Sequence, residues 1–289
     1  LIFMEFRMDD LNKLNHKIEI KPFTPNLGGV IRGIDLSKKL NDVDLTTVKE
    51  AFKKYQVLFF QKQSEIPPEI QVHLGKSFGP LHVHPAAPTM KGHPEIFEIH
   101  THKDSKISNG TENFHSDVSC DKHPPLGTML QLHILPECGG DTLFTNMYMA
   151  YDCLSENMKM FLQNLKAWHE SEHIYKGRYS ERGVSDKDIL CPSSLHPVIR
   201  THPETGKKAI FVNRSFTTKI DGMTSSESKA ILNFLFDHCE DLRFQIRYRW
   251  NKNDMAFWDN RCTMHRAVWD YYPMERKGRR VTIKGDEPK

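Results

Sequence analysis

Apolar residues recur at helical spacing in four stretches of the chain, each next to a residue type that commonly starts a helix. In the first stretch, Val48, Phe52 and Tyr55 fall on one face of a helix. Asn41 or Asp42 precedes them and has the short polar side chain that caps helix N-termini. The pattern predicts a helix from this cap to about Tyr55, with the apolar face turned inward.

The other three stretches have similar start signals. Pro68 is expected to begin a helix that stops at Gly79, because proline suits the first turn and glycine the end. A third helix is expected from about Ser155. A fourth follows Thr224 and Glu227, whose spacing is that of a capping box.

Most of the remaining chain consists of short apolar stretches between turn residues. These predict strands at 57–60, 81–84, 95–100, 128–134, 197–200, 209–213, 255–259 and 279–284. Strands and helices do not alternate regularly, as a parallel α/β sheet would require. The pattern therefore predicts a mainly β protein, a sandwich or barrel covered by helices. Since no repeat or linker interrupts it, we expect residues 1–289 to form a single domain.

Composition narrows the classes of function. The chain is 38% hydrophobic, 10% aromatic and 27% charged, an ordinary globular balance. No apolar run reaches the roughly 18 residues of a membrane helix. The formal net charge of +3 is too small to indicate a nucleic-acid or membrane surface. We therefore expect neither a nucleic acid nor a membrane as a partner.

The cysteines and the N-terminal residues bear on the compartment. The 6 cysteines are irregularly spaced and form no C-x-x-C pair, which is typical of single thiols in a reducing compartment. Near the N-terminus, Glu5, Arg7 and Asp9 interrupt the apolar stretch that a signal peptide needs. These features favour a cytoplasmic location.

The 16 histidines raise the question of a metal site. His169, Glu170 and His173 fit H-E-x-x-H, which on a helix would hold zinc. The metzincin extension is absent and the surroundings are polar, so a zinc hydrolase is a remote alternative. His82 and His84 would share one face of a strand and could form half a metal site, although a polar strand end is the favoured explanation for His82.

Four motifs in order carry a more specific signal. They are H-S-D at His115 and Asp117, G-G-D-T ending at Thr142, W-D-N-R followed by His265, and finally Arg276. An H-x-D pair alone is expected about once by chance. Together the motifs, with 27 residues from His115 to Thr142 and 11 from His265 to Arg276, resemble the taurine dioxygenase family of Fe(II)/2-oxoglutarate-dependent dioxygenases. That family includes alkylsulfatase and 2,4-dichlorophenoxyacetate dioxygenases, and the resemblance covers about residues 18–286.

The resemblance implies a double-stranded β-helix, or jelly roll, and a set of chemical roles. His115, Asp117 and His265 would bind Fe(II) as two histidines and one carboxylate, leaving positions for 2-oxoglutarate and O₂. Thr142 and Arg276 would bind the far carboxylate of 2-oxoglutarate, Arg276 through its planar fork. Because Asp117 is present, we expect hydroxylation and not halogenation.

The resemblance also implies a pocket for a small organic anion. Its contacts would be His84, Asn113, Val118, Tyr175, Phe216 and Arg280. Arg280 and His84 match positions that hold a sulfonate, although a structural ion pair is the alternative for Arg280. The implied reaction hydroxylates an alkanesulfonate such as taurine or a larger relative, giving sulfite and an aldehyde, with succinate and CO₂.

Two departures from the taurine enzyme leave the substrate open. Ala87 stands where that enzyme has tyrosine, and Tyr175 where it has phenylalanine. The small Ala87 predicts an enlarged pocket. An alkyl sulfate or an aryloxy or alkyl carboxylate is therefore an alternative, and a non-catalytic anion-binding barrel is an alternative of another class. By resemblance alone, we expect a homo-oligomer.

Overall fold

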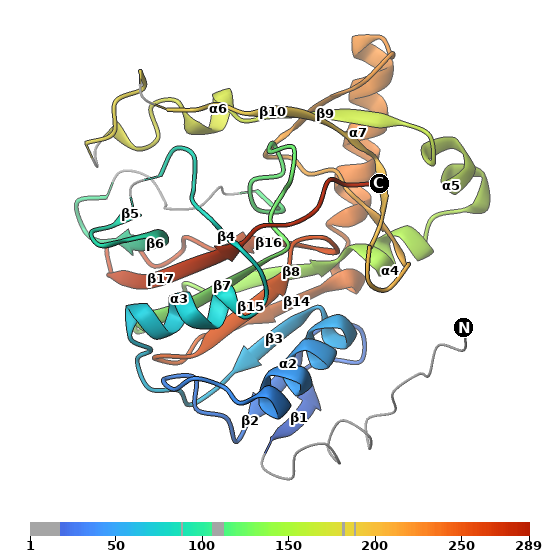
Figure 1. The fold of residues 1–289 in the computed structure, drawn as a ribbon. Coiled ribbons are helices and arrows are strands. Elements are labelled where there is room, and N and C mark those ends of the chain that lie inside the picture. The colour runs from blue at the N-terminus through green and yellow to red at the C-terminus, as the bar shows by residue number, and fades with distance from the viewer. Residues whose placement is uncertain (1–17, 88, 106–112, 181–182, 188) are drawn as a thin grey trace.

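The computed structural model describes residues 18–87, 89–105, 113–180, 183–187 and 189–289. Its largest layer is a nine-stranded sheet (Figure 1). The strands follow the order β1 (Glu19–Pro22), β2 (Gly29–Arg32), β3 (Val57–Phe60), β15 (Met255–Asp259), β7 (Gly127–Ile134), β17 (Arg276–Ile283), β6 (His93–Thr101) and β5 (Thr89–Met90), with β4 (Leu81–His82) paired to β17.

Three smaller sheets complete the β structure. They are β14 (Gln245–Tyr248), β8 (Thr142–Asn146) and β16 (Thr263–Ala267); β10 (Ser193–Pro197), β9 (Lys166–Glu170) and β13 (Thr217–Ile220); and β11 (Ile199–Thr201) with β12 (Lys208–Ile210). The β14-β8-β16 sheet packs on the nine-stranded sheet through aromatic rings. The Phe59 and Tyr248 rings stack at 3.9 Å, and Phe144 lies 5.6 Å from Trp258. The expected jelly roll is confirmed.

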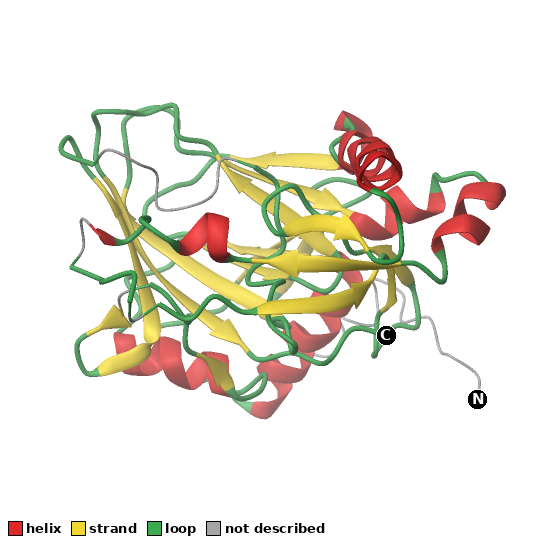
Figure 2. Cartoon of the chain, turned by 90° about the horizontal axis from the view of Figure 1, so that it is seen from above, coloured by secondary structure: helices red, strands yellow, loops and turns green. Residues whose placement is uncertain are grey.

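Helices cover the strands, as predicted (Figures 1 and 2). Their bounds are α2 (Asp42–Tyr55), α3 (Pro68–Lys76), α4 (Met147–Asp152), α5 (Glu156–Leu162), α6 (Glu172–Tyr175) and α7 (Ser225–Cys239), with a 3₁₀ turn η2 (Leu242–Phe244). Helices α2 and α3 lie against the nine-stranded sheet, whereas α4 and α7 contact the smaller sheets. The Phe52 ring of α2 stacks on Phe257 of β15 at 3.8 Å, so the amphipathic face is buried as expected.

The predicted helix starts are confirmed, and one predicted end is wrong. Asn41 caps α2 by accepting from the Asp44 amide, and Thr224 forms the capping box of α7. Helix α3 ends at Lys76, before the expected Gly79. Its last turn tightens because the Ser77 amide donates to carbonyl groups three and four residues earlier.

Strand β17 runs through the middle of the large sheet, between β7 and β6. Gly278 makes this possible, because a Cβ atom there would lie 2.3 Å from the Gln131 carbonyl oxygen of β7. A bulge between Lys277 and Gly278 shifts the register. Strand β17 thereby carries Arg276 and Arg280 into the space between the packed sheets.

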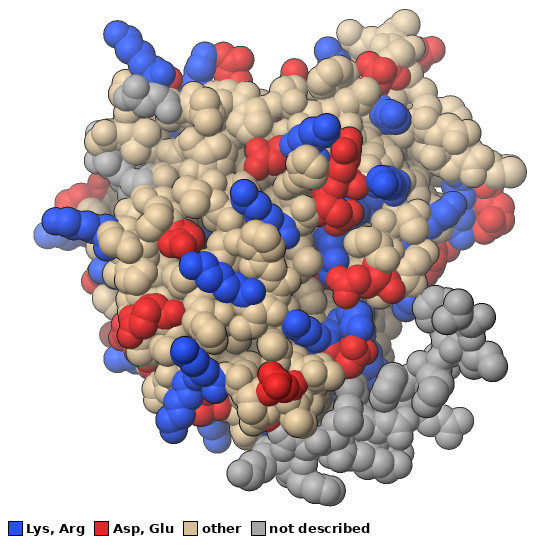
Figure 3. Space-filling view, viewed as in Figure 1, with Lys and Arg blue, Asp and Glu red and all other residues tan. Residues whose placement is uncertain are grey.

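All six cysteines are free. In the described part of the chain, no helix is long and apolar enough to cross a bilayer. On the face in Figure 3, basic and acidic side chains are intermixed.

Candidate active site

Two imidazoles and one carboxylate converge between the packed sheets. His265 lies on β16, and His115 pairs with it through two backbone hydrogen bonds of 3.0 and 2.8 Å. Asp117 follows in a turn, and its Oδ1 lies 3.8 Å from His115 Nε2 and 4.0 Å from His265 Nε2. All three residues are buried, and their donor atoms lie within 4.8 Å of one another. This group could hold one metal ion with open positions on the far side.

A hydrogen-bond network fixes Asp117, and the sequence did not indicate it. Thr128 of β7 donates to Asp117 Oδ2 at 2.7 Å. Asn260 donates to the Thr128 hydroxyl at 2.9 Å and accepts from the Asp117 amide at 3.2 Å. Trp258 donates to the same Asn260 oxygen at 3.1 Å. The W-D-N-R motif was the available signal in the sequence. Its Asn260 is the residue that positions Asp117.

The protonation states suit metal binding. Burial lowers the pKa of His265 to about 3, and the neighbouring His115 lowers it further in the same direction. Burial also lowers the pKa of His115. For Asp117 burial alone would raise the pKa, but Arg280 and the two histidines lower it below the usual range. The group therefore presents neutral imidazoles and an ionised carboxylate, the forms that ligate metals.

One cavity beside this group is lined by Thr142, Arg276 and His265. Arg276 is buried, its Nε donates to the Gly140 carbonyl at 3.2 Å, and among the described residues its Nη2 has no partner. Gly140 has φ +72°, and a Cβ there would lie 3.2 Å from Arg276 Cδ. The Thr142 hydroxyl accepts from Trp250 Nε1 at 3.0 Å, which leaves its own proton to donate. These donors fit the far carboxylate of a dicarboxylic acid.

A second cavity meets the first at His115 and Arg280, which line both. Of the predicted substrate contacts it contains His84, Val118, Tyr175, Phe216 and Arg280. His84 Nδ1 accepts from the Ala86 and Ala87 amides at 3.1 and 2.9 Å, so its proton sits on Nε2. Burial, then the charge of Arg280, lowers the pKa of His84 well below its usual value. His84 is thus a neutral donor.

Arg280 links the two cavities to the carboxylate. Its Nη1 lies 2.8 Å from Asp117 Oδ1, and its guanidinium stacks on the Phe97 ring at 4.9 Å. The ion pair foreseen as the alternative for Arg280 is therefore present in this conformation. The next residue after Asp117, Val118, has φ 45°, a strained value for a β-branched side chain.

The structure adds lining residues that the sequence did not indicate: Phe97, Ile174, Arg178 and Tyr179. Ala87 does not line the cavity. It packs in a buried cluster with Tyr175 and Tyr179. The enlarged pocket stays a prediction. Asn113 is exposed, and its carbonyl oxygen lies 3.1 Å from His115 Nδ1.

The zinc-hydrolase interpretation is wrong. His169 lies on β9, whereas His173 lies on α6, so the two histidines do not share a helix face. The buried His169 Nδ1 bonds the Ser119 hydroxyl at 2.9 Å. His173 Nε2 donates to the Ser215 carbonyl at 2.7 Å. Each imidazole serves a local hydrogen bond.

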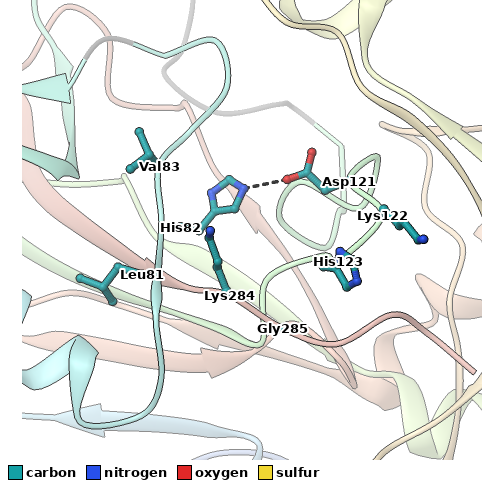
Figure 4. Close-up of a pocket in the computed structure, with 8 residues that line it drawn as sticks. All are labelled: Leu81, His82, Val83, Asp121, Lys122, His123, Lys284 and Gly285. Carbon is teal, nitrogen blue, oxygen red and sulfur yellow. Dashed lines mark hydrogen bonds and ion pairs between the residues drawn. The ribbon is translucent and has the colours of Figure 1, made fainter.

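His82 is also separate from the site. Its Nε2 bonds Asp121 Oδ2 at 2.7 Å on the wall of another cavity of about 440 Å³ (Figure 4). Lys284 lies beside the ring in this view. Of the H-x-H pair, His84 alone reaches the cavity next to Asp117, so the half-site explanation fails.

Another buried group contains His202, Asp259 and Cys262. Arg261 donates to both carboxylate oxygens of Asp259, at 2.9 and 2.7 Å. His202 Nε2 bonds the same carboxylate at 3.1 Å. The charge of Asp259 is already matched, and the cluster serves to hold the turn that carries Asn260.

The comparisons with known proteins agree with this geometry. The family model described as "Taurine catabolism dioxygenase TauD, TfdA family" matches residues 19–282. An alpha-ketoglutarate-dependent sulfonate dioxygenase of Saccharomyces cerevisiae is 30% identical over 94% of this chain and 68% of its own length. An alkylsulfatase of Acinetobacter baylyi is 32% identical, over 93% of this chain and 86% of its own.

Comparison with solved structures points to the same family. The crystal structure of a taurine dioxygenase from Burkholderia xenovorans has a TM-score of 0.80 and 30% identity, and the match covers 94% of this chain and 92% of that one. The family match spans both packed sheets and every residue of the His-Asp-His group. The chain therefore belongs to the TauD/TfdA family of alpha-ketoglutarate-dependent dioxygenases.

Proposed function

We propose that the protein binds Fe(II) through His115, Asp117 and His265 and hydroxylates a small organic sulfonate at the expense of 2-oxoglutarate and O₂. One observation carries the proposal. The three proposed metal-binding groups lie where two cavities meet, and buried arginines line these cavities: Arg276 lines the first, and Arg280 lines both. A dicarboxylic co-substrate and an anionic substrate can then reach one metal from two sides.

The cofactor side has defined tasks. Arg276 would bind the far carboxylate of 2-oxoglutarate through its fork, and the Thr142 hydroxyl would donate to the same group. Fe(II) held by the triad would supply the redox chemistry that couples O₂ to oxidation of 2-oxoglutarate and substrate. Asn260 and Thr128 keep the Asp117 carboxylate oriented during binding and release of substrates.

The substrate side has donors for an oxyanion. His84 Nε2–H and the Arg280 guanidinium would bind the sulfonate, while Phe216 and Val118 wall off water. Hydroxylation of the carbon that bears sulfur yields an unstable product whose C–S bond breaks. The balance is sulfonate, O₂ and 2-oxoglutarate giving aldehyde, sulfite, succinate and CO₂.

The ligand assignment can be tested without turnover. Fe(II) and 2-oxoglutarate added anaerobically should give a weak visible charge-transfer band. His265→Ala should abolish the band, whereas His73→Ala, an exposed histidine on α3, should retain it. An unchanged band in His265→Ala would contradict the ligand set.

The substrate class needs a product assay. Succinate release should be screened over alkanesulfonates, alkyl sulfates and aryloxyacetates, with sulfite and sulfate measured in parallel. Sulfite from a sulfonate supports the proposal. The similarity to an alkylsulfatase makes an alkyl sulfate the second candidate, and it would give sulfate. Succinate with sulfate alone would replace the first proposal with the second.

A further inference from the structure

The substrate cavity contains a second guanidinium group, that of Arg178. This residue follows α6, and its amide donates to the Tyr175 carbonyl oxygen at 3.2 Å across a turn in which Gly177 has φ 75°. The turn directs a half-buried Arg178 into the lining of the cavity that also contains Arg280 and His84. The neighbouring Lys176 is exposed and pairs with Glu172 on α6.

The two arginines approach the cavity from different layers. Arg280 comes from β17 in the large sheet, whereas Arg178 follows α6. Figure 1 shows α6 above β6 and β17. The carboxylate that lines the cavity, Asp117, accepts from Arg280 at 2.8 Å. The charge of Arg178 also reaches the interior. After burial and Arg280, it is one of the groups that lower the pKa of His84.

This arrangement bears on what the far end of the substrate can be. A guanidinium repels an ammonium group and binds a carboxylate through two parallel hydrogen bonds. In a cavity walled by Phe97, Tyr175 and Tyr179, such a contact is partly shielded from water and so gains strength. A taurine-like amine would meet the wrong charge.

We propose that Arg178 recognises a second anionic group, so that the preferred substrate is a short-chain sulfonate with a carboxylate at its other end. The inference rests on the proposed function. The sulfonate would bind to Arg280 and His84, and the carboxylate to Arg178 near the cavity mouth. Arg178 is then a specificity-determining residue for this chain.

Three sulfonates of equal chain length test the proposal: 4-sulfobutanoate, its primary amide, and 4-aminobutane-1-sulfonate. The intact protein with Fe(II) and 2-oxoglutarate should show a kcat/KM for the carboxylate roughly 10-fold above that for the amide, the amine being poorest. In Arg178→Gln the carboxylate and amide values should converge. Lys176→Gln removes a neighbouring charge and should keep the preference.

The outcomes separate the two proposals. Sulfite formed from all three compounds at equal kcat/KM overturns the role of Arg178 and leaves the sulfonate reaction standing. A preference that survives in Arg178→Gln also overturns it. Sulfite from none of them overturns both. Circular dichroism will show whether Arg178→Gln folds. If it does not, the test uses Arg178→Lys together with the order of kcat/KM for the three sulfonates in the wild-type protein. Lysine is expected to keep part of the preference for the carboxylate.

Discussion

The cofactor side and the substrate side of the site are built differently. On the cofactor side, Thr142 lies in β8 and is paired on both edges, with Tyr248 and with Ala267. Arg276 lies on β17 opposite Thr101. On the substrate side, Phe97 and Arg280 come from strands of the large sheet, and the other lining residues come from segments after β4, before β7, around α6 and before β13.

This difference explains which parts of the site relatives can share and which parts they can vary. Backbone pairing fixes Thr142 and Arg276, the proposed cofactor donors, to within the tolerance of a sheet, so a chain that keeps this fold and these two residues can keep the same co-substrate site. Side chains on connecting segments can be exchanged without disturbing a ladder. On the proposed assignments, reaction class depends on the His-Asp-His group and the cofactor donors, whereas substrate choice depends on residues such as Tyr175 and Arg178.

The sharpest test of this division removes the cofactor arginine. Arg276→Leu should lower kcat/KM for 2-oxoglutarate about 1,000-fold, because one partner of a buried charge pair is lost. The KM for the sulfonate should change little. Lys277→Gln, the next residue on β17, is the matched control. Equal effects on both substrates would show that the two sides are not separable.

The corresponding change on the substrate side should be smaller. Arg280→Gln should raise the KM for the sulfonate roughly 30-fold, as expected for loss of a charged hydrogen bond, with the KM for 2-oxoglutarate nearly constant. The neighbouring Arg279 pairs with Glu65 outside the cavity, so Arg279→Gln should leave both KM values unaltered. A 2-oxoglutarate KM that rises with Arg280→Gln would contradict the separation.

The smallest expected effect concerns the pH dependence of stability and comes from the buried His169 on β9. Burial lowers the pKa of His169 to about 3. As pH falls from about 6.5, the unfolded chain binds a proton that the folded chain excludes, so stability is lost toward acid. At pH 5.5 this amounts to about 1.4 kcal/mol of the free energy of unfolding. Urea unfolding at pH 7.5 and 5.5 should show a smaller difference for His169→Gln; identical differences would refute the assignment.

Local signals predicted much of the fold. The caps at Asn41 and Thr224 and the apolar runs Val57–Phe60 and Met255–Asp259 were sufficient to place α2, α7, β3 and β15. Eight strands lie outside every predicted strand: β1, β2, β5, β8, β9, β13, β14 and β16. They are short and carry polar residues, and they exist because neighbouring strands pair with them. Such pairing is not visible in a local window.

The site divides in the same way. Motif spacing identified His115, Asp117 and His265, and the structure brings them together. Their roles, and those of Thr142 and Arg276, stay predictions until metal and 2-oxoglutarate binding are measured. Asn260 and Thr128 were missed because a buried polar partner is defined by contacts between distant segments. Arg178 was missed because its surroundings in the sequence are typical of a charged surface.

The position of β17 has a consequence for how the protein is made. This strand follows the other sixteen in the described part of the chain, yet it forms the middle of the large sheet, between β7 and β6. While it is still in the ribosome, those two strands have no common neighbour, and Arg276 and Arg280 are absent from the cavities. The His115–His265 backbone pairing likewise joins segments made far apart in time. Assembly of the His115–Asp117–His265 group is thereby postponed until His265 has been made, 150 residues after His115.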